Sequence, residues 1–486
     1  MQLNKLLESL VCTEINGNTS REISGICIDS RLVTEGSLFV AQEGTQADGH
    51  QFIAQAVNRG AAAIMFCKGE VSDYTAAPET VFIKVADTHN ALGAVASCFF
   101  GYPSRKLQLV GITGTNGKTT TVTLLYRLFR SLGYSCGLLS TIANYIDDRE
   151  IAATHTTPDA LEINGLLAQM CEHGCQYCFM EVSSHSIDQG RIDHLEFTGG
   201  IFSNITHDHL DYHKTFALYI QAKKRFFDNL PASAFALTNT DDKNGMVMVQ
   251  NTRAKVVTYA CKRMADYNAR ILEHSVDGMQ LRIDGEEIWT SFIGAHNAYN
   301  LLAVYACARQ LGVPKEECLT RMSLLKTVSG RLENIRGGNN LTAVVDYAHT
   351  PDALENVLKT LREILQEGQE LICVVGCGGN RDKTKRPEMA QIADRYADWC
   401  VFTSDNPRFE EPDDILADMM TGLTAEQQQK HLCITNRKEA VKTALRTARP
   451  GAIILVAGKG HENYQDVKGV KTHFDDKEII REIFKL

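Results

Sequence analysis

The sequence lacks a long apolar run, a secretory leader and an excess of basic charge. No stretch of it approaches the roughly 20 apolar residues that span a bilayer, and the N-terminal MQLNKLLESL has no signal-peptide profile. Its 50 basic and 59 acidic residues give a net charge of -9, which argues against a general affinity for nucleic acid or anionic membranes. We therefore expect a cytoplasmic protein with no membrane insertion and no nucleic-acid partner.

A disulfide framework and a cysteine-rich metal motif are also missing. The 15 cysteines, an odd number scattered through 486 residues, fit reduced thiols in a cytosol. Cys175 and Cys178 form a single C-x-x-C with Cys171 nearby, and without a second pair the pattern favours ordinary packing over a zinc or redox site. Apolar residues at 44% are ample for burial, and the length predicts about three domains.

The segment 106–133, KLQLVGITGTNGKTTTVTLLYRLFRSLG, is the strongest pattern in the chain. It predicts a buried strand at Leu107–Val110, a glycine-rich turn at Gly111–Gly117 and a helix at Lys118–Leu132. Strand, turn and helix follow in the order of a phosphate-binding loop. The alternative is a turn that merely joins a strand to a helix.

In such a loop, backbone N–H groups and the helix N-terminus surround phosphate oxygens. Lys118 would add a positive charge near the outer phosphates, and the hydroxyl of Thr119 would hold a magnesium ion. The usual first glycine of the motif is Ile112 here, and Gly114 supplies the flexibility instead. The segment is thus a compact variant of the P-loop.

Two later segments gather carboxylates and histidines. The predicted strand Cys178–Val182 contains Glu181 at its end, where a P-loop domain places a second magnesium ligand. His185, just beyond, could join the metal or cap a helix. The segment 202–213, FSNITHDHLDYH, resembles a metal cluster with His207, His209, His213, Asp208 and Asp211. Its spacing matches no zinc signature, and capping with hydrogen bonding explains several of these residues equally well.

A predicted helix then carries Lys223 and Lys224. A lysine that faces metal ions must lose its positive charge to be useful there. A carbamate formed with carbon dioxide would turn it into an anionic ligand.

The flanking regions have the pattern of further α/β units. Residues 1–105 mix short strands and helices with polar loops, which suit a phosphorylated ligand or are ordinary turns. Residues 333–486 alternate strands and helices, and each strand ends in a polar or glycine-rich loop: DYAH, GCGGNRDK, SDNPR and GKGHENYQ. In an open parallel sheet these strand ends share one edge, where ligands bind.

Nine segments together resemble the Mur ligase family in order, in spacing and over nearly the whole chain. They are GITGTNGKTT, MEVSSH, THDHLDYH, GAHNAYN, SGRLE, DYAHTPDAL, GCGGNRDKTKRP, DNPRFEEP and AGKGHENYQ. Within that family the chain is most similar to the MurE type, which adds meso-diaminopimelate. The resemblance implies a three-domain α/β architecture: a UDP-MurNAc-binding domain (1–105), a central P-loop ATPase domain (106–332) and a Rossmann-like amino-acid-binding domain (333–486).

The reaction that the resemblance implies is amide-bond formation in peptidoglycan synthesis. The D-glutamate carboxylate of UDP-MurNAc-L-Ala-D-Glu would attack the γ-phosphate of ATP, and the amine of meso-diaminopimelate would displace phosphate from the resulting acyl phosphate. Cations must screen the two anions that meet. The implied cofactors are ATP, two Mg²⁺ ions and CO₂ held as a carbamate on Lys223, although Lys224 beside it leaves that assignment open. We expect a monomer.

The resemblance also assigns roles to motif residues. The ATP-binding positions are Gly114, Thr115, Asn116, Gly117, Lys118, Thr119, Thr120, Asn300 and Arg331. The catalytic positions are Lys118, Lys223, His185, Asp346 and His349. The metal ligands are Thr119, Glu181, His185 and carbamylated Lys223. The positions for UDP-MurNAc-dipeptide are Ile28, Ser30, Thr45, Gln46, Ala47, Thr156, Thr157, Ser183, Gln189 and Arg191. The family's usual Asn before the paired threonines is His155 here.

The diaminopimelate positions are Arg381, Asp405, Asn406, Pro407, Arg408, Gly458 and Glu462. The planar guanidinium of Arg408 suits the distal carboxylate that distinguishes diaminopimelate from lysine, and leaving it unpaired would penalise lysine. An exposed Pro-Arg turn is the alternative. Rival functions are a lysine-adding ligase of the same family, a folylpolyglutamate synthetase with the same P-loop variant, and a nucleotide-dependent switch or binding module without ligase chemistry.

Overall fold

The computed structural model describes residues 1–44, 47–74, 79–206, 208 and 210–486. The chain forms two compact units: Met1–Asp266 with Ala303–Val313, and Tyr267–Leu302 with Pro314–Leu486. Helix α10 (Ala295–Gln310) contributes residues to both. The predicted boundaries of three domains are not tested by this division and stay a prediction.

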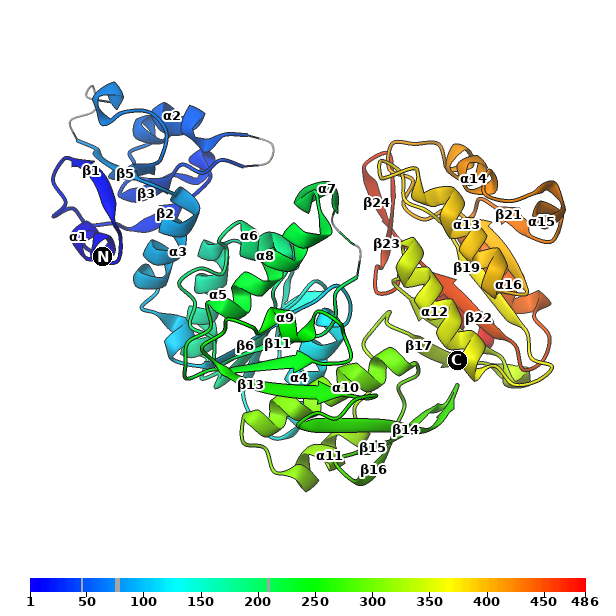
Figure 1. Cartoon of the computed structure of the whole chain (residues 1–486). Helices are drawn as coiled ribbons and strands as arrows, with labels where there is room; N and C mark the ends of the chain where they lie inside the picture. The colour runs from blue at the N-terminus through cyan, green and yellow to red at the C-terminus, as the bar shows by residue number, and fades with distance from the viewer. Residues whose placement is uncertain (45–46, 75–78, 207, 209) are drawn as a thin grey trace. The chain divides into compact units, whose positions relative to one another are not determined.

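The first unit begins with a small sheet whose elements are blue in Figure 1. Its strand order is β1-β5-β4-β3-β2, and only β1 is antiparallel to its neighbour. The elements are α1 (Leu3–Leu7), β1 (Cys12–Asn16), β2 (Gly25–Cys27), β3 (Ser37–Val40), α2 (Ile53–Asn58), β4 (Ala63–Phe66), β5 (Val81–Val85) and α3 (Thr88–Phe99), with 3₁₀ turns at Ser30–Leu32, Gly49–Phe52, Val71–Tyr74 and Pro103–Arg105.

A larger sheet follows in the same unit, in the order β13-β12-β11-β6-β10-β7-β8-β9. Its strands are β6 (Gln108–Thr113), β7 (Cys136–Leu139), β8 (Ala143–Ile146), β9 (Arg149–Ala152), β10 (Tyr177–Glu181), β11 (Gly199–Phe202), β12 (Phe235–Asn239) and β13 (Lys255–Ala260). Its helices are α4 (Lys118–Ser131), α5 (Ala160–Glu172), α6 (Ser184–Asp188), α7 (Leu210–His213), α8 (Phe216–Asp228) and α9 (Gly245–Met248). Because β6 lies parallel between β10 and β11, the ends of all three strands reach one edge.

The second unit starts with the antiparallel strands β14 (Tyr267–Ser275), β15 (Gly278–Ile283) and β16 (Glu286–Thr290). Its main sheet has the order β17-β18-β22-β19-β20-β21, with only β17 antiparallel. The strands are β17 (Glu333–Arg336), β18 (Thr342–Asp346), β19 (Leu371–Val375), β20 (Trp399–Thr403), β21 (Leu432–Ile434) and β22 (Ile453–Ala457), and β23 (Tyr464–Val467) and β24 (Val470–His473) pair separately. The helices are α11 (Lys315–Ser323), α12 (Pro351–Ile364), α13 (Lys385–Tyr396), α14 (Pro412–Met420), α15 (Ala425–Gln429), α16 (Arg437–Thr447) and α17 (Asp476–Phe484), with a 3₁₀ turn at Gly338–Asn340.

This sheet is buried on both faces. Alternate residues of β19 pack into different cores: Cys373 and Val375 face the cluster with α12 and α13, whereas Ile372 and Val374 face the cluster with α16 and α17. A parallel strand with helices on both sides therefore needs apolar residues throughout, as the sequence LICVV provides. The polar residues are left to the loops at the strand ends.

The α/β fold class with a P-loop central region is confirmed, and several predicted boundaries shift by a few residues. The largest difference concerns Gly111, which we placed in a turn. Strand β6 continues to Thr113 because it stays paired with β10 and β11. Gly111 lies between packed rings, where a Cβ would stand 2.8 Å from Phe226 Cζ and 2.9 Å from Phe197 Cε1. The glycine thus permits close packing within the strand. Among the described residues, no helix has the length and apolarity to cross a bilayer.

Candidate active site

The phosphate-binding loop connects β6 to α4. Gly117 has φ +87°, in the left-handed region that favours glycine. A Cβ at Gly114 would lie 2.0 Å from Ser203 Oγ, so only glycine lets the loop approach the end of β11 so closely. Asn204 then fixes the loop, since its Oδ1 accepts from the Asn116 N–H at 2.9 Å and its Nδ2 donates to the Asn116 carbonyl at 3.0 Å.

Lys118 is the first residue of α4, and its ammonium lies over the loop. Its Nζ donates to the carbonyl oxygens of Gly114 at 2.8 Å and Thr115 at 2.9 Å. Thr119 and Thr120 follow in the buried first turn of the helix. A cation, backbone N–H groups and a helix N-terminus therefore meet at one point, as binding of phosphate oxygens requires.

Lys223 reaches the same loop from α8. Its side chain is 1% exposed, and its Nζ donates to the Gly114 carbonyl at 2.9 Å and to Thr113 Oγ1 at 3.4 Å. Burial, together with the nearby charge of Lys118, holds the pKa of Lys223 well below its usual value. The neighbouring Lys224 instead pairs with Asp228 at 2.5 Å. Of the two lysines that the sequence left open, Lys223 is the one beside the P-loop.

Glu181 ends β10 at the edge where β6 leads into the P-loop. The carboxylate is buried, and its Oε1 accepts from the Thr141 N–H at 2.8 Å. His185 lies in α6, with its ring centroid 4.2 Å from that of Tyr212. His213 contacts Ser184 Oγ at 2.9 Å, so it takes part in hydrogen bonding between α6 and α7.

The dense histidine and aspartate segment is only partly described. His207 and His209 lie outside the described residues. Among those described, no three His, Cys, Asp or Glu side chains are grouped as a metal site would require. Magnesium makes a smaller demand, because it is held by one or two carboxylates together with waters and substrate phosphates. The Thr119 hydroxyl and the Glu181 carboxylate are oxygen donors of this kind, so these residues fit that ion.

A pocket of about 630 Å³ opens between the N-terminal elements and the loop after α6. Its lining includes Gln189 and Arg191, which we predicted, and His155, where the family pattern has Asn. Arg191 donates through Nε and Nη2 to Gln189 Oε1 at 2.9 and 2.6 Å, and burial lowers its pKa. The lining also includes Gln42 and His89, which no sequence motif marked, and Tyr212 from the motif THDHLDYH, to which the sequence assigned no role.

The other predicted dipeptide residues surround the end of β10. Arg191 Nη1 donates to the Thr157 carbonyl at 2.8 Å, and Thr157 Oγ1 donates to the Glu181 carbonyl at 2.8 Å and accepts from the Ser183 N–H at 3.1 Å. Thr156 Oγ1 accepts from Thr141 Oγ1 at 3.1 Å. These side chains therefore form one hydrogen-bonded group with Glu181.

Of the N-terminal positions predicted for UDP-MurNAc-dipeptide, the described ones, Ile28, Ser30 and Ala47, do not line this pocket. Ile28 packs at the edge of the N-terminal core, and Ser30 Oγ donates to Gln55 Oε1 at 2.8 Å. Neither residue lines the pocket. Ala47 is exposed, with its carbonyl accepting from the Gly44 N–H at 2.9 Å. Thr45 and Gln46 lie outside the described residues.

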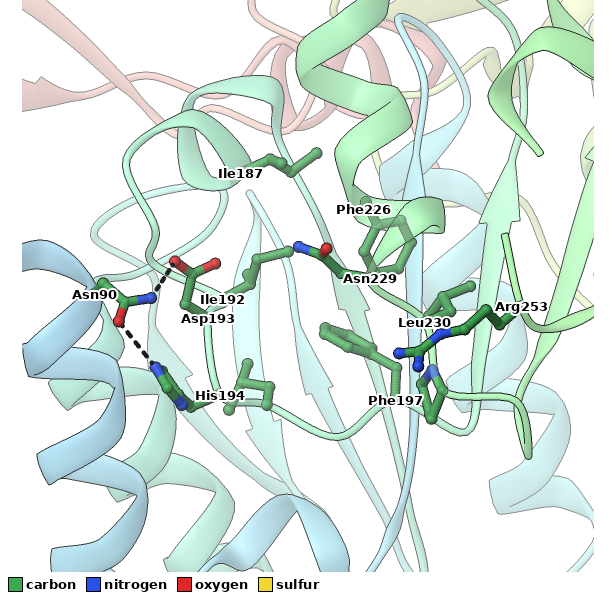
Figure 2. Close-up of a pocket in the computed structure, with 12 residues that line it drawn as sticks. Asn90, Ile187, Ile192, Asp193, His194, Phe197, Phe226, Asn229, Leu230 and Arg253 are labelled. Atoms are coloured by element: carbon green, nitrogen blue, oxygen red, sulfur yellow. Dashed lines mark hydrogen bonds between the residues drawn. The ribbon is translucent and has the colours of Figure 1, made fainter. Parts of the chain in front are cut away.

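Figure 2 shows a second pocket, of about 370 Å³, behind the loop that carries Arg191. Asn90 of α3 bridges two residues of this loop: its Nδ2 donates to Asp193 Oδ2 at 3.2 Å, and its Oδ1 lies 3.3 Å from His194 Nε2. None of the predicted site residues lines this pocket. The contacts tie α3 to the loop and so help to hold Arg191 in place.

In the second unit, Arg331 and His349 lie beside the end of β18, where Asp346 ends the strand. The Asp346 carboxylate accepts from the Leu332 and Ala348 N–H groups, both at 2.8 Å, and burial raises its pKa. Arg331 stacks on the Tyr347 ring at 5.1 Å, and its buried Nε has no hydrogen-bond partner among the described residues. Asp346 therefore fixes the backbone just after Arg331 and just before His349.

His349 and Asn300 have local partners within the same unit. His349 Nδ1 lies 2.8 Å from the Tyr347 carbonyl. Asn300 is buried on α10, and its Nδ2 donates to Asn297 Oδ1 at 3.0 Å.

The strand-end loops after β20 and β22 bring together four predicted amino-acid-binding residues. Asn406 Nδ2 donates to Glu462 Oε2 at 2.8 Å, and burial raises the pKa of Glu462. A Cβ at Gly458 would stand 2.4 Å from Asp405 Oδ2, so glycine allows these loops to touch. The sequence analysis missed the fully buried Lys459, whose Nζ lies 3.9 Å from Asp405 Oδ1 and 3.6 Å from Glu462 Oε2. Its place within AGKGHENYQ was the available signal.

Arg408 lies on the loop after β20, where this loop touches the loop after β19. Its Nη1 donates to the Gly379 carbonyl at 2.8 Å, and a Cβ at Gly379 would stand 1.9 Å from the Pro407 carbonyl oxygen. Arg381 is exposed on the loop that contains Gly379. Both arginines therefore belong to one pair of touching loops at the same sheet edge as Asp405 and Glu462.

Comparisons with known proteins agree with this arrangement. Three family models match: "Mur ligase family, catalytic domain" at residues 22–100, "Mur ligase middle domain" at 112–308 and "Mur ligase, glutamate ligase domain" at 330–460. A UDP-N-acetylmuramoyl-L-alanyl-D-glutamate--2,6-diaminopimelate ligase of Phocaeicola vulgatus is 54% identical, covering 100% of this chain and 99% of its own.

Two solved structures have the same fold. One, of a protein with the same ligase name, gives a TM-score of 0.73 at 32% identity, covering 100% of this chain and 99% of its own. A MurF ligase from Thermotoga maritima in complex with ADP gives a TM-score of 0.61 at 18% identity, covering 96% of this chain and 97% of its own. On the family models and the full-length identity, the predicted resemblance is confirmed, and the chain belongs to the Mur ligase family.

Proposed function

We propose that this chain is an ATP-dependent ligase that joins meso-diaminopimelate to UDP-MurNAc-L-Ala-D-Glu in peptidoglycan synthesis. The observation that carries the proposal is the 54% identity over the whole chain to a ligase named for these substrates. In the reaction, the D-glutamate carboxylate attacks the γ-phosphate of ATP, which yields an acyl phosphate and ADP. An amine of diaminopimelate then attacks the acyl carbon, phosphate leaves, and the amine nitrogen loses a proton.

The P-loop geometry supports the first step. Lys118 and the loop N–H groups would bind the phosphates and screen their charge from the incoming carboxylate. Arg331, whose Nε is buried without a partner among the described residues, would contribute a further donor to ATP. Asp346 is a positioning residue in this scheme, since it holds the backbone beside Arg331.

Lys223 would act as a carbamate. Burial lowers the pKa of Lys223 and so favours the uncharged amine, which can add through its nitrogen to the carbon of CO₂ and lose one proton to form an anion. Carbamylated Lys223, Glu181, Thr119 and His185 would hold two Mg²⁺ ions. When bound, these ions supply charge stabilisation for the transferring phosphoryl group.

The remaining sites divide the substrates between them. The pocket with Gln189 and Arg191 would take the muramoyl dipeptide, because a half-buried guanidinium suits the dipeptide carboxylate. Arg408 and Arg381 would meet the distal carboxylate of diaminopimelate. Asp405 and Glu462 contribute two carboxylates, and the buried Lys459 between them contributes one ammonium. The net negative charge that remains would attract the distal ammonium of diaminopimelate.

The test is an ADP-release assay with ATP, UDP-MurNAc-L-Ala-D-Glu and one amine at a time. We expect turnover with meso-diaminopimelate and, at equal concentration, about a hundredfold less with L-lysine, because a site built to pair a charged group strongly rejects an analogue without it. Folate with glutamate should give none. Activity with lysine alone would overturn the choice of substrate, and slow ATP turnover independent of any amine would favour a nucleotide switch.

Two further parts of the proposal concern where and how the protein acts. We place it in the cytoplasm as a monomer. The 15 cysteines, all free of disulfide bonds among the described residues, support a reducing compartment.

A further inference from the structure

Arg386, in the first turn of α13, is 0% exposed yet carries a permanent charge. Its Nη1 and Nη2 donate to the two carboxylate oxygens of Glu410 at 3.0 and 2.9 Å, and Nη1 also donates to Asp418 Oδ2 at 2.8 Å. A buried guanidinium is tolerated only when its geometry and hydrogen bonds are good. The two-pronged contact with Glu410 supplies directional hydrogen bonds, and of the three guanidinium nitrogens Nε has no partner among the described residues.

Glu410 connects the two loops that carry the arginines of the amino-acid site. It lies two residues after Arg408, and its Oε1 accepts from the N–H of Asn380, the residue before Arg381. The Asn380 side chain returns the contact, because its Oδ1 accepts from the Phe409 N–H at 3.0 Å. One carboxylate therefore joins the loop after β19 to the loop after β20.

Both loops need such support. Arg408 has φ +52°, a left-handed conformation that an arginine seldom adopts, and Asn380 has φ +51°, which asparagine tolerates better. The hydrogen bonds of Arg386 lower the pKa of Glu410 to about 2, so the carboxylate stays ionised at any physiological pH. Changes of pH in this range therefore do not break the contact that Glu410 makes between the two loops.

We propose that the Arg386–Glu410 ion pair is a positioning pair that sets the preference of this ligase for diaminopimelate over lysine, by fixing the loop backbones that carry Arg381 and Arg408. The pair does not touch the substrate. Without it, the two guanidiniums lose their fixed spacing, and a ligand that needs both suffers more than lysine, which has no distal carboxylate. This inference rests on the proposed function.

Asp418 provides a matched control. It also accepts from Arg386, but it lies on α14 rather than on either loop, and its side chain is 42% exposed. Asp418→Asn therefore removes a charged partner of Arg386 and leaves the tie between the loops in place. Lys383, a 66% exposed partner of Glu410 at 3.2 Å, offers a second control as Lys383→Ala.

The experiment measures kcat and KM for meso-diaminopimelate and for L-lysine in the full-length protein and in Glu410→Gln, Arg386→Lys, Asp418→Asn and Lys383→Ala. For Glu410→Gln we expect KM for diaminopimelate to rise about tenfold, since small displacements of binding groups cost one to two orders of magnitude. The KM for ATP should not change. The preference for diaminopimelate over lysine should fall by a similar factor, with a smaller loss in Arg386→Lys and none in the two controls.

If Glu410→Gln lost kcat/KM equally for both amines, the Arg386–Glu410 ion pair would have only a structural role, and the inference would be overturned. So would a change in preference in Asp418→Asn as large as that in Glu410→Gln. Thermal unfolding identifies a variant that fails to fold. If Glu410→Gln fails in this way, Arg386→Lys, which keeps the positive charge, decides the outcome by its preference for diaminopimelate over lysine. A wild-type protein that prefers lysine would refute the proposed function itself. This result is distinguishable from failure of the inference, because it is seen in the wild type without any substitution.

Discussion

Lys223→Ala should lower kcat by about a hundred- to a thousandfold, the usual loss when one preorganised electrostatic group is removed from an active site. The lysine is buried against the Gly114 carbonyl, so its loss removes the proposed carbamate from beside the P-loop. Steady-state ADP release with saturating substrates measures the effect. Added bicarbonate should not restore activity to the variant, because no amine remains to carry CO₂.

The neighbouring residue gives the control. Lys224→Ala removes a lysine one position away that pairs with Asp228, and it should retain near-normal kcat. A ¹³C NMR spectrum with labelled bicarbonate should show a carbamate signal in the wild type and in Lys224→Ala, and none in Lys223→Ala. Full turnover in Lys223→Ala would remove the residue from the active site.

The proposed carbamate depends on a feature that sequence cannot supply, namely the burial that lowers the pKa of Lys223. Lys223 and Lys224 are adjacent and chemically identical in the sequence. The helical geometry of α8 turns one toward β6 and the other toward Asp228, one turn along the same helix. Which of two neighbouring side chains enters a site is decided by tertiary packing, whereas the presence of lysines on this helix is readable from the sequence.

The same distinction explains other successes and omissions. The strand-end motifs were readable because each follows a continuous apolar strand, as LICVV precedes GCGGNRDK. Arg386, in contrast, is part of KTKRPE, a run of polar and charged residues that reads as an exposed segment. Its complete burial follows from pairing with Glu410 and Asp418, partners 24 and 32 positions along the chain. No local pattern indicates such a contact.

Arg408→Ala should raise KM for meso-diaminopimelate by about ten- to a hundredfold, the equivalent of one charge-assisted hydrogen bond. The KM for ATP should stay near its wild-type value, because ATP meets other residues. The exposed neighbour gives the control: Phe409→Ala, at a side chain that is 72% exposed, should change neither constant. Steady-state kinetics with each substrate varied in turn provides both values, and equal weakening for both ligands would indicate misfolding.

The backbone at this position calls for a second variant. Because Arg408 has φ +52°, alanine there adds strain to the loss of the guanidinium, whereas asparagine adopts the left-handed region far more readily. Arg408→Asn should therefore match Arg408→Ala in its KM for diaminopimelate while unfolding at a higher temperature. If Arg408→Asn instead restored a wild-type KM, the effect of alanine would come from the backbone, and the guanidinium would have no part in recognising the distal carboxylate.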